Sequence, residues 1–96
     1  MTGKQRAQLR SMANGLETII QVGKGGITEN LIKQTDDALT ARELIKGSLL
    51  ETCPIPVRDV ATQLAQAVNA EIIQVIGRRF VLYRENPQDK KIFLSK

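Results

Sequence analysis

Residues 18–28, TIIQVGKGGIT, decide the fold of this chain because they predict a strand, a sharp turn and the start of a helix. The β-branched run 18–22 is typical of a short strand. Gly23-Lys24-Gly25-Gly26 allows positive φ and a close backbone approach. Thr28 suits a helix N-cap, so free N–H groups and a positive dipole end would lie beside the glycines. This composition suits either a phosphate site or a plain tight turn.

The remaining sequence alternates helices and strands. Residues 2–14 predict a first helix, which begins with a Thr2/Gln5 capping box. Residues 85–91 predict a turn or a loose segment, and residues 92–94 either a short docked strand or a frayed end, so 85–96 is a candidate loose tail. The other predicted elements are a helix over 28–42, a strand over 43–50, a loop over 51–56, a helix over 56–69, and strands over 71–76 and 80–84.

The element order is therefore α-β-α-β-α-β-β in a single domain over residues 1–96. The first two strands and their helix predict a right-handed parallel crossover, and Gly77-Arg78-Arg79 predicts the tip of a closing hairpin. We expect an α/β fold, a two-layer sandwich with a mixed four-stranded sheet. The buried stripe expected on the first helix consists of Leu9, Met12, Ala13 and Leu16.

Composition limits the possible functions. The chain has one cysteine, Cys53, and no histidine, which excludes an internal disulfide and argues against a zinc site. No run approaches the roughly 20 apolar residues that span a bilayer, and the N-terminal residues lack the apolar stretch of a secretory signal. We therefore expect a cytoplasmic protein with no membrane contact, metal or cofactor.

The net charge of +4 is segregated along the chain. Residues 1–26 carry four basic residues and one acid, residues 27–77 carry four and seven, and residues 78–96 carry six and two. This order predicts two basic patches that the fold could bring together, which would suit a polyanion. Ordinary solvation of the surface is the alternative explanation.

Catalysis is disfavoured. Without histidine, acid–base chemistry would fall to other side chains, and no pattern shows which of them would meet in a cleft. Asp36 and Asp37 are adjacent on a predicted helix, diverge from each other and are expected to be solvated. The glycine turn also lacks the spacing of an NTPase P-loop or a dinucleotide fingerprint.

The same turn does satisfy Gly-x-x-Gly, the loop with which KH domains clamp backbone nucleotides. The pattern is weak by itself, and a structural turn is the alternative. Lys24 inside the turn favours a phosphate, whereas Glu29 in the first helical turn would oppose one. Phe80 and Tyr83 are expected in the core or in hairpin packing, so the sequence predicts recognition of RNA backbone and shape rather than base stacking.

Four blocks in this order resemble the CRM domain (chloroplast RNA splicing and ribosome maturation): Thr2 to Arg6 with Leu9-Arg10, Gln21 to Gly26, Ala41 to Lys46, and Gln74 to Gly77 with Val81 to Arg84. The resemblance covers essentially the whole chain, and the stand-alone bacterial form is the YhbY-like protein. It implies a fold akin to the C-terminal domain of translation initiation factor three, and binding to precursors of the large ribosomal subunit. Gly47 departs from expectation, since a β-branched residue would suit a strand better.

By position, the resemblance implies a set of RNA-contacting residues: Lys4, Arg6, Arg10, Gly23, Lys24, Gly25 and Gly26, with Arg42, Lys46, Arg78 and Arg84 as further candidates. We expect a monomeric, non-catalytic RNA-binding protein that acts on ribosomal RNA during assembly of the large subunit. The alternative is a protein-interaction adapter that docks an assembly factor or a ribosomal protein on the acidic surface of Glu29, Asp36 and Asp37.

Overall fold

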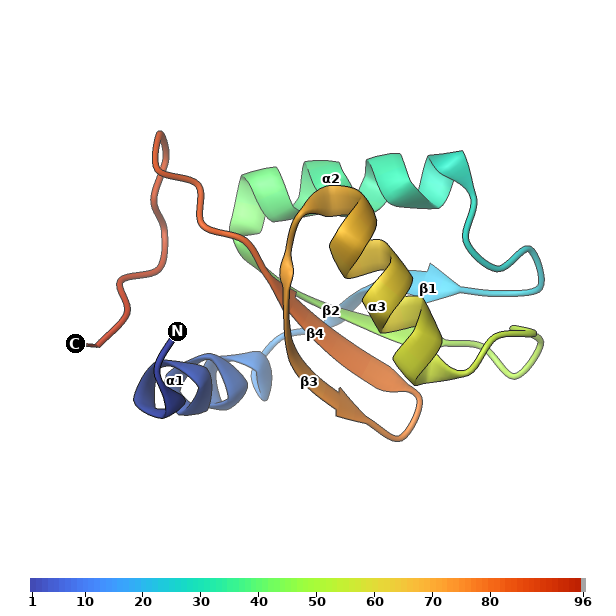
Figure 1. Ribbon diagram of the computed structural model, residues 1–96, viewed down its shortest axis with the longest axis horizontal. Coiled ribbons are helices and arrows are strands. Elements are labelled where there is room, and N and C mark those ends of the chain that lie inside the picture. The colour runs from blue at the N-terminus through green and yellow to red at the C-terminus, as the bar shows by residue number, and fades with distance from the viewer. Residues whose placement is uncertain (96) are drawn as a thin grey trace.

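The computed structural model describes residues 1–95, so Lys96, the last residue of the candidate tail, lies outside it. The elements are α1 (Gly3–Ala13), β1 (Thr18–Val22), α2 (Glu29–Arg42), β2 (Leu44–Leu49), α3 (Val57–Val68), β3 (Glu71–Ile76) and β4 (Arg79–Tyr83) (Figure 1). The sheet order is β1-β2-β4-β3, with β1 and β2 parallel and the other two pairs antiparallel. The predicted element order and mixed four-stranded sheet are confirmed.

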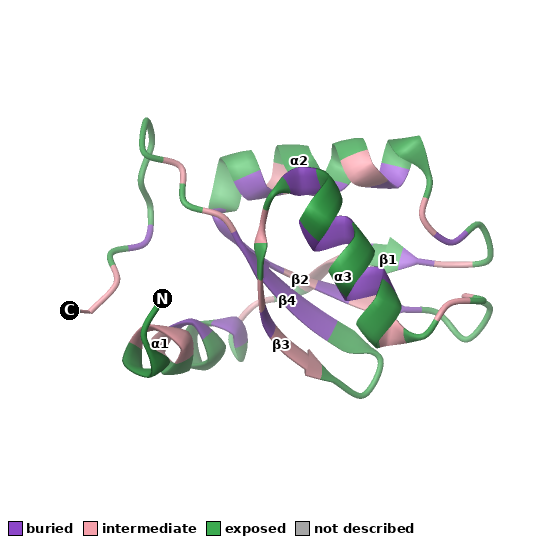
Figure 2. Ribbon diagram, in the orientation of Figure 1, coloured by how far each residue is buried: buried purple, intermediate pink, exposed green. Residues whose placement is uncertain are grey.

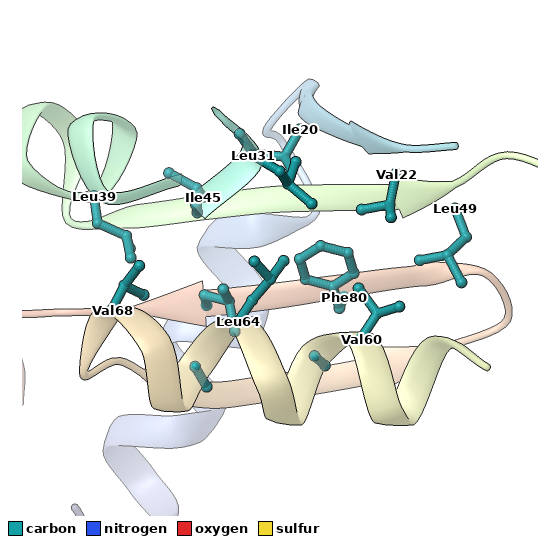
Figure 3. Packing of buried hydrophobic residues seen from close by; sticks show 13 residues of the cluster. Ile20, Val22, Leu31, Leu39, Ile45, Leu49, Val60, Leu64, Val68 and Phe80 are labelled. Atoms are coloured by element: carbon teal, nitrogen blue, oxygen red, sulfur yellow. The ribbon is translucent and has the colours of Figure 1, made fainter. Parts of the chain in front are cut away.

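The helices lie on both faces of the sheet. α2 and α3 pack on one face, where Phe80, Ile45 and Val22 from the strands meet Leu39 and Leu64 from the helices (Figure 3). These helices and the sheet form the predicted two layers. α1 packs on the opposite face, over one end of the sheet, in a second cluster (Figure 1). The buried members of the second cluster are Leu9, Ala13, Leu44, Ile73, Val81, Tyr83 and Ile92.

Local capping sets the helix ends. Thr2 and Gln5 form the predicted capping box, with the Gln5 N–H donating to Thr2 Oγ1 at 3.1 Å. Thr28 caps α2 as predicted, since its hydroxyl accepts the N–H of Leu31 at 3.1 Å. Along both α2 and α3, buried residues form a stripe toward the sheet and exposed residues form the outer surface (Figure 2).

Met12 does not belong to the buried stripe of α1. Its side chain is 41% exposed, whereas Leu9 and Ala13 are buried. α1 covers only part of its face of the sheet, so its apolar stripe is narrower than helical spacing predicts. Inclusion of Met12 in the core was therefore wrong.

The expectation that a β-branched residue would suit position 47 of β2 better was also wrong. Gly47 is directly opposite Phe80 in the β2–β4 pair, and the Phe80 ring fills the space above it. A Cβ placed on Gly47 would lie 2.7 Å from Phe80 Cε2, closer than real Cβ contacts. A β-branched residue cannot fit here unless the ring moves, so glycine is the residue that this strand requires.

Glu43 ends α2 instead of starting β2, with φ of 66° and no exposed surface. Its carboxylate accepts the backbone N–H groups of Asn86, Lys91 and Ile92 at 2.6, 2.6 and 2.7 Å. Burial raises the pKa of the Glu43 carboxyl, but these three hydrogen bonds and the nearby Lys90 charge lower it, and the net result is a pKa below the ordinary value.

The segment after β4 is docked without forming a strand. Ile92 is buried in the second cluster, and the side chains of Gln5 and Gln8 donate to the carbonyls of Ser95 and Phe93 at 2.9 and 3.0 Å. The basic beginning and end of the chain therefore lie side by side. Among residues 1–95, no helix is long and apolar enough to cross a membrane.

Candidate nucleic-acid interface

The glycine loop, Gly23 to Gly26, joins β1 to the N-terminus of α2. The Gly26 N–H donates to the Gly23 carbonyl at 2.9 Å, which closes a tight turn. Gly26 has φ of 63°, and a Cβ on it would lie 3.3 Å from Ile55 Cδ1. Gly25 differs, because a Cβ there would lie at an ordinary 3.7 Å from Thr28 Cγ2. Gly26 is thus needed for the turn itself, while Gly25 has room for a side chain.

Three connections meet at one edge of the sheet, on the right of Figure 1. The β1–α2 loop and the β2–α3 loop follow parallel strands, and the Leu50 N–H donates to the Val22 carbonyl at 2.9 Å. The β3–β4 hairpin reaches the same edge, since the Leu49 N–H donates to the Arg78 carbonyl at 2.7 Å. The fold therefore places Lys24 and Arg78 at one edge although they are far apart in sequence.

The charges at this edge are exposed. Lys24 is solvent-exposed, and within residues 1–95 no ion pair involves it. Arg78 pairs with Glu51 at 3.4 Å, but both side chains are more than half exposed, so the pair is weak and a phosphate could displace it. Glu29 is exposed in the first turn of α2, as predicted.

The cations of α1 form a second group, at the opposite end of the sheet from the glycine loop (Figure 1). Lys4 and Arg10 are exposed. Arg6 is not free in the same way, because its guanidinium donates to the Ile72 carbonyl at 2.8 Å and pairs with Glu71 at 3.1 Å. Arg6 thus fastens α1 to β3.

Arg84 is also held by the protein. Its guanidinium contacts Asp36 at 2.6 Å, the Val68 carbonyl at 2.8 Å and the Thr40 hydroxyl at 2.9 Å, and its side chain is 23% exposed. Asp36 is consequently an ion-pair partner rather than a purely solvated residue. Arg84 ties β4 to α2 and to the end of α3.

The two remaining candidates differ from each other. Arg42 is exposed in the last turn of α2. Lys46 is half-buried, and its ammonium donates to the Leu16 carbonyl at 3.4 Å. Arg79, which the four blocks did not include as a site residue, is exposed at the start of β4 beside Arg78. The Gly-Arg-Arg hairpin tip was the signal for Arg79.

Two of the three aromatic residues are buried, and the third is exposed. Phe80 and Tyr83 are buried in the two clusters, as predicted. Burial raises the pKa of Tyr83, and the negative charges of Glu43 and Glu85 raise it further. Phe93 is exposed, with the Lys90 ammonium 5.5 Å from the ring centroid.

The groups that could support other chemistry are sparse in residues 1–95. No cluster of His, Cys, Asp or Glu there could hold a metal ion. The Cys53 thiol is half-buried and donates to the Ile55 carbonyl at 3.5 Å, so it is a packing residue of the β2–α3 loop. The geometry offers anion-binding cations and loop amides.

The profile of the CRS1 / YhbY (CRM) domain matches residues 1–84. The chain therefore belongs to the CRS1/YhbY (CRM) domain family.

Three relatives illustrate this membership. The chain is 48% identical to Bacillus subtilis "Probable RNA-binding protein YqeI" over 98% of both chains. It is 35% identical to Methanocaldococcus jannaschii "Probable RNA-binding protein MJ0652", over 100% of this chain and 72% of that one. The solution structure of Staphylococcus aureus SAV1595 superposes with a TM-score of 0.81, at 46% identity and 99% coverage of both chains.

Proposed function

We propose that this chain is a non-catalytic, cytoplasmic RNA-binding protein that binds ribosomal RNA in precursors of the large ribosomal subunit as a monomer. RNA is the partner named in the descriptions of the B. subtilis and M. jannaschii relatives. The ribosomal target follows from the CRM resemblance of the four sequence blocks.

The observation that carries the proposal is the glycine loop. Lys24 is exposed in a turn where Gly25 carries no side chain, directly before the first turn of a 14-residue helix. Backbone N–H groups and a mobile cation at a helix N-terminus can grip a phosphodiester without a Cβ in the way. Arg78 on the neighbouring hairpin adds a second cation at the same edge.

The test is a variant with Lys24→Asp and Gly25→Asp. A side chain fits at residue 25, so the midpoint of thermal unfolding should move little. Affinity for a ribosomal RNA fragment that contains duplex and loop should fall strongly, because two carboxylates replace a cation at the phosphate site. Lys33 is an exposed lysine on the outer surface of α2, so Lys33→Glu is the control for a general loss of positive charge. It is compared with Lys24→Glu, which makes the same charge change in the glycine loop.

Salt dependence gives an independent measurement. If four to six phosphates are neutralised on duplex regions, log affinity should fall against log salt concentration with a slope of roughly −4 to −5. Affinity that does not change with salt would contradict the proposal. If the folded Lys24→Asp, Gly25→Asp variant binds RNA as tightly as the wild type, the glycine loop has only a structural role.

The adapter alternative is less favoured by the contacts of the acidic surface. Asp36 is held by Arg84 at 2.6 Å, whereas the pair of Asp37 with Lys33 at 3.1 Å is exposed and weak, so one of the three carboxylates is engaged within the fold. Capture of partners with and without nuclease separates the two functions. Partners that survive nuclease would favour the adapter.

A further inference from the structure

The sheet face that points away from α2 and α3 carries a continuous row of side chains across all four strands. Register pairs Gln21 with Ser48, Ser48 with Arg79, and Arg79 with Ile76. Residues opposite each other on paired strands project to the same side of a sheet. The neighbouring residues Val22, Leu49 and Phe80 face the α2/α3 core, which fixes this row on the other side.

Within residues 1–95, no helix covers this row. α1 packs over the far end of the same face, where Leu44 and Tyr83 are buried beneath it. Ile76 is 63% exposed, Gln21 and Arg79 are exposed, and Ser48 is half-buried. A groove of about 650 Å³ opens over the row and extends to Arg78 on the hairpin.

The chemistry of the groove is one-sided. Arg78 and Arg79 line it, and no carboxylate is among its lining residues, while Glu51 outside the groove pairs with Arg78 at 3.4 Å. Lys46, which register places opposite Thr18, adds a cation in the next row of the same face. The surface thus complements a polyanion in charge, although the chain as a whole carries both signs.

The other lining groups suit nucleotides rather than a simple anion. Gln21 supplies an amide, Ser48 and Thr18 supply hydroxyls, and Ile76 supplies an exposed apolar surface. Amides and hydroxyls can bond to base edges and to the 2′-OH, while a base can lie against the isoleucine. In an A-form duplex the major-groove base edges are out of reach of side chains, whereas splayed bases of a single strand are accessible.

We propose that this groove binds a single-stranded segment of RNA, with Arg79 and Arg78 on its phosphates and a base against Ile76. The proposal rests on the proposed RNA-binding function and assigns it a second contact surface. Gln21, at one end of the row, lies two residues before Gly23. An RNA strand that leaves the groove at Gln21 therefore reaches the glycine loop. The loop grips the backbone, and the groove accepts the unpaired nucleotides beside it.

The experiment measures binding of a fluorescent ten-nucleotide oligouridylate, and of an RNA hairpin with a fully paired stem, by anisotropy. Arg79→Glu and Ser48→Glu each put a carboxylate into the groove on the solvent side. Each should weaken oligouridylate binding about tenfold. Arg79→Glu, which removes one phosphate contact, should also make the salt slope about 0.7 less steep. Lys33→Glu matches the charge change of Arg79→Glu on the opposite face of the molecule and should leave the affinity unchanged.

Ser48→Glu serves as the second variant if Arg79→Glu disturbs the hairpin, as judged by thermal unfolding. A 4-thiouridine oligonucleotide gives a separate readout, and its photo-crosslink should map to the β3–β4 hairpin around Ile76. Crosslinks confined to the outer surface of α2 would contradict the proposal.

The outcomes separate this proposal from the function on which it rests. If folded groove variants bind the oligouridylate as tightly as the wild type while the Lys24/Gly25 variant loses RNA, the groove proposal fails and the RNA-binding function stands. If the wild type binds only the paired hairpin, the groove proposal fails in the same way. If the wild type binds neither RNA, both fail.

Discussion

Gly47 and Phe80 form a directly opposed pair in the β2–β4 ladder, and the phenyl ring lies where any side chain at residue 47 would begin. Phe80 has no exposed surface and is the largest fully buried side chain of the described chain. It lies in the core between the sheet and the helices α2 and α3, as Figure 3 shows. The missing side chain of Gly47 is therefore what lets an aromatic ring fill the centre of a core otherwise made of aliphatic residues.

Gly47→Ala should destabilise the protein. In an ordinary strand this change is expected to stabilise by roughly 0.5–1 kcal/mol, because glycine loses more backbone entropy on folding. Here the added methyl overlaps the ring, and we expect a loss of about 1–3 kcal/mol from overpacking. Chemical denaturation measures the change.

Ser48→Ala, on the opposite face of the same strand, is the control and should be nearly neutral. Combining Gly47→Ala with Phe80→Leu should cost less than the sum of the two single changes, since the smaller side chain leaves room for the methyl. Additive costs would show that the ring and the glycine are not coupled.

Glu43→Gln should destabilise the protein by about 1–3 kcal/mol at neutral pH. The two carboxylate oxygens of Glu43 accept three backbone N–H groups, whereas a glutamine has one acceptor oxygen and an NH2 group that cannot accept. The folded-state pKa of Glu43 lies below its ordinary value of 4.5, so its ionised form contributes stability above that pH. As the pH falls through the lower folded-state pKa, the wild type should lose this contribution and the gap to Glu43→Gln should narrow.

Unfolding curves for both proteins between neutral pH and pH 3 measure this effect. Hydrogen exchange should also show faster opening around Asn86 to Ile92 in the variant. Glu85→Gln, an exposed carboxyl in a surface pair, is the control. A stability gap that widens toward acid would contradict this account of Glu43.

Arg84→Met should act on stability rather than on RNA. The change removes the ion pair with Asp36 and leaves the Val68 carbonyl without its guanidinium donor, with an expected cost of about 1–3 kcal/mol. Arg42→Met removes an exposed cation and should leave stability nearly unchanged. If the RNA affinity of the folded protein falls more for Arg84→Met than for Arg42→Met, Arg84 contacts RNA and this prediction is wrong.

Arg6 and Arg10 are also predicted to have different roles, one in stability and one in RNA binding, although they lie one turn apart on α1. Arg6→Gln should lower the unfolding midpoint by several degrees, because the helix loses its attachment to the Ile72 carbonyl and Glu71. Arg10→Gln should leave the midpoint unchanged and weaken RNA binding with a smaller salt slope. Equal effects of the two changes on the midpoint would contradict the attachment of Arg6.

Features with local causes were predictable from the sequence. The caps at Thr2 and Thr28 and the glycine turn depend on residues a few positions apart, and the structure has them as expected. Gly47 was misread because its partner, Phe80, is 33 positions away and propensity describes only the strand itself. The pairing of β2 with β4, which brings Phe80 opposite Gly47, is what requires a glycine there.

The candidate site shows the same limit. Composition counts Arg6, Arg84 and Arg10 as equivalent cations, yet two of them have protein partners that only the tertiary structure supplies. The row through Arg79 is likewise invisible to a motif, since it takes one residue from each strand. Charge along the chain predicted that cations would be available, but not which ones face solvent.

Glu43 also sets an order on folding during synthesis. Its carboxylate is buried at the end of α2, but its hydrogen-bond donors are residues made more than forty positions later. Until Ile92 has left the ribosomal exit tunnel, a helix and sheet that are otherwise complete would enclose an acid without donors. Closure of the fold around Glu43 therefore requires residues 86–92, and the nascent domain should stay open at this place until that segment is free of the ribosome.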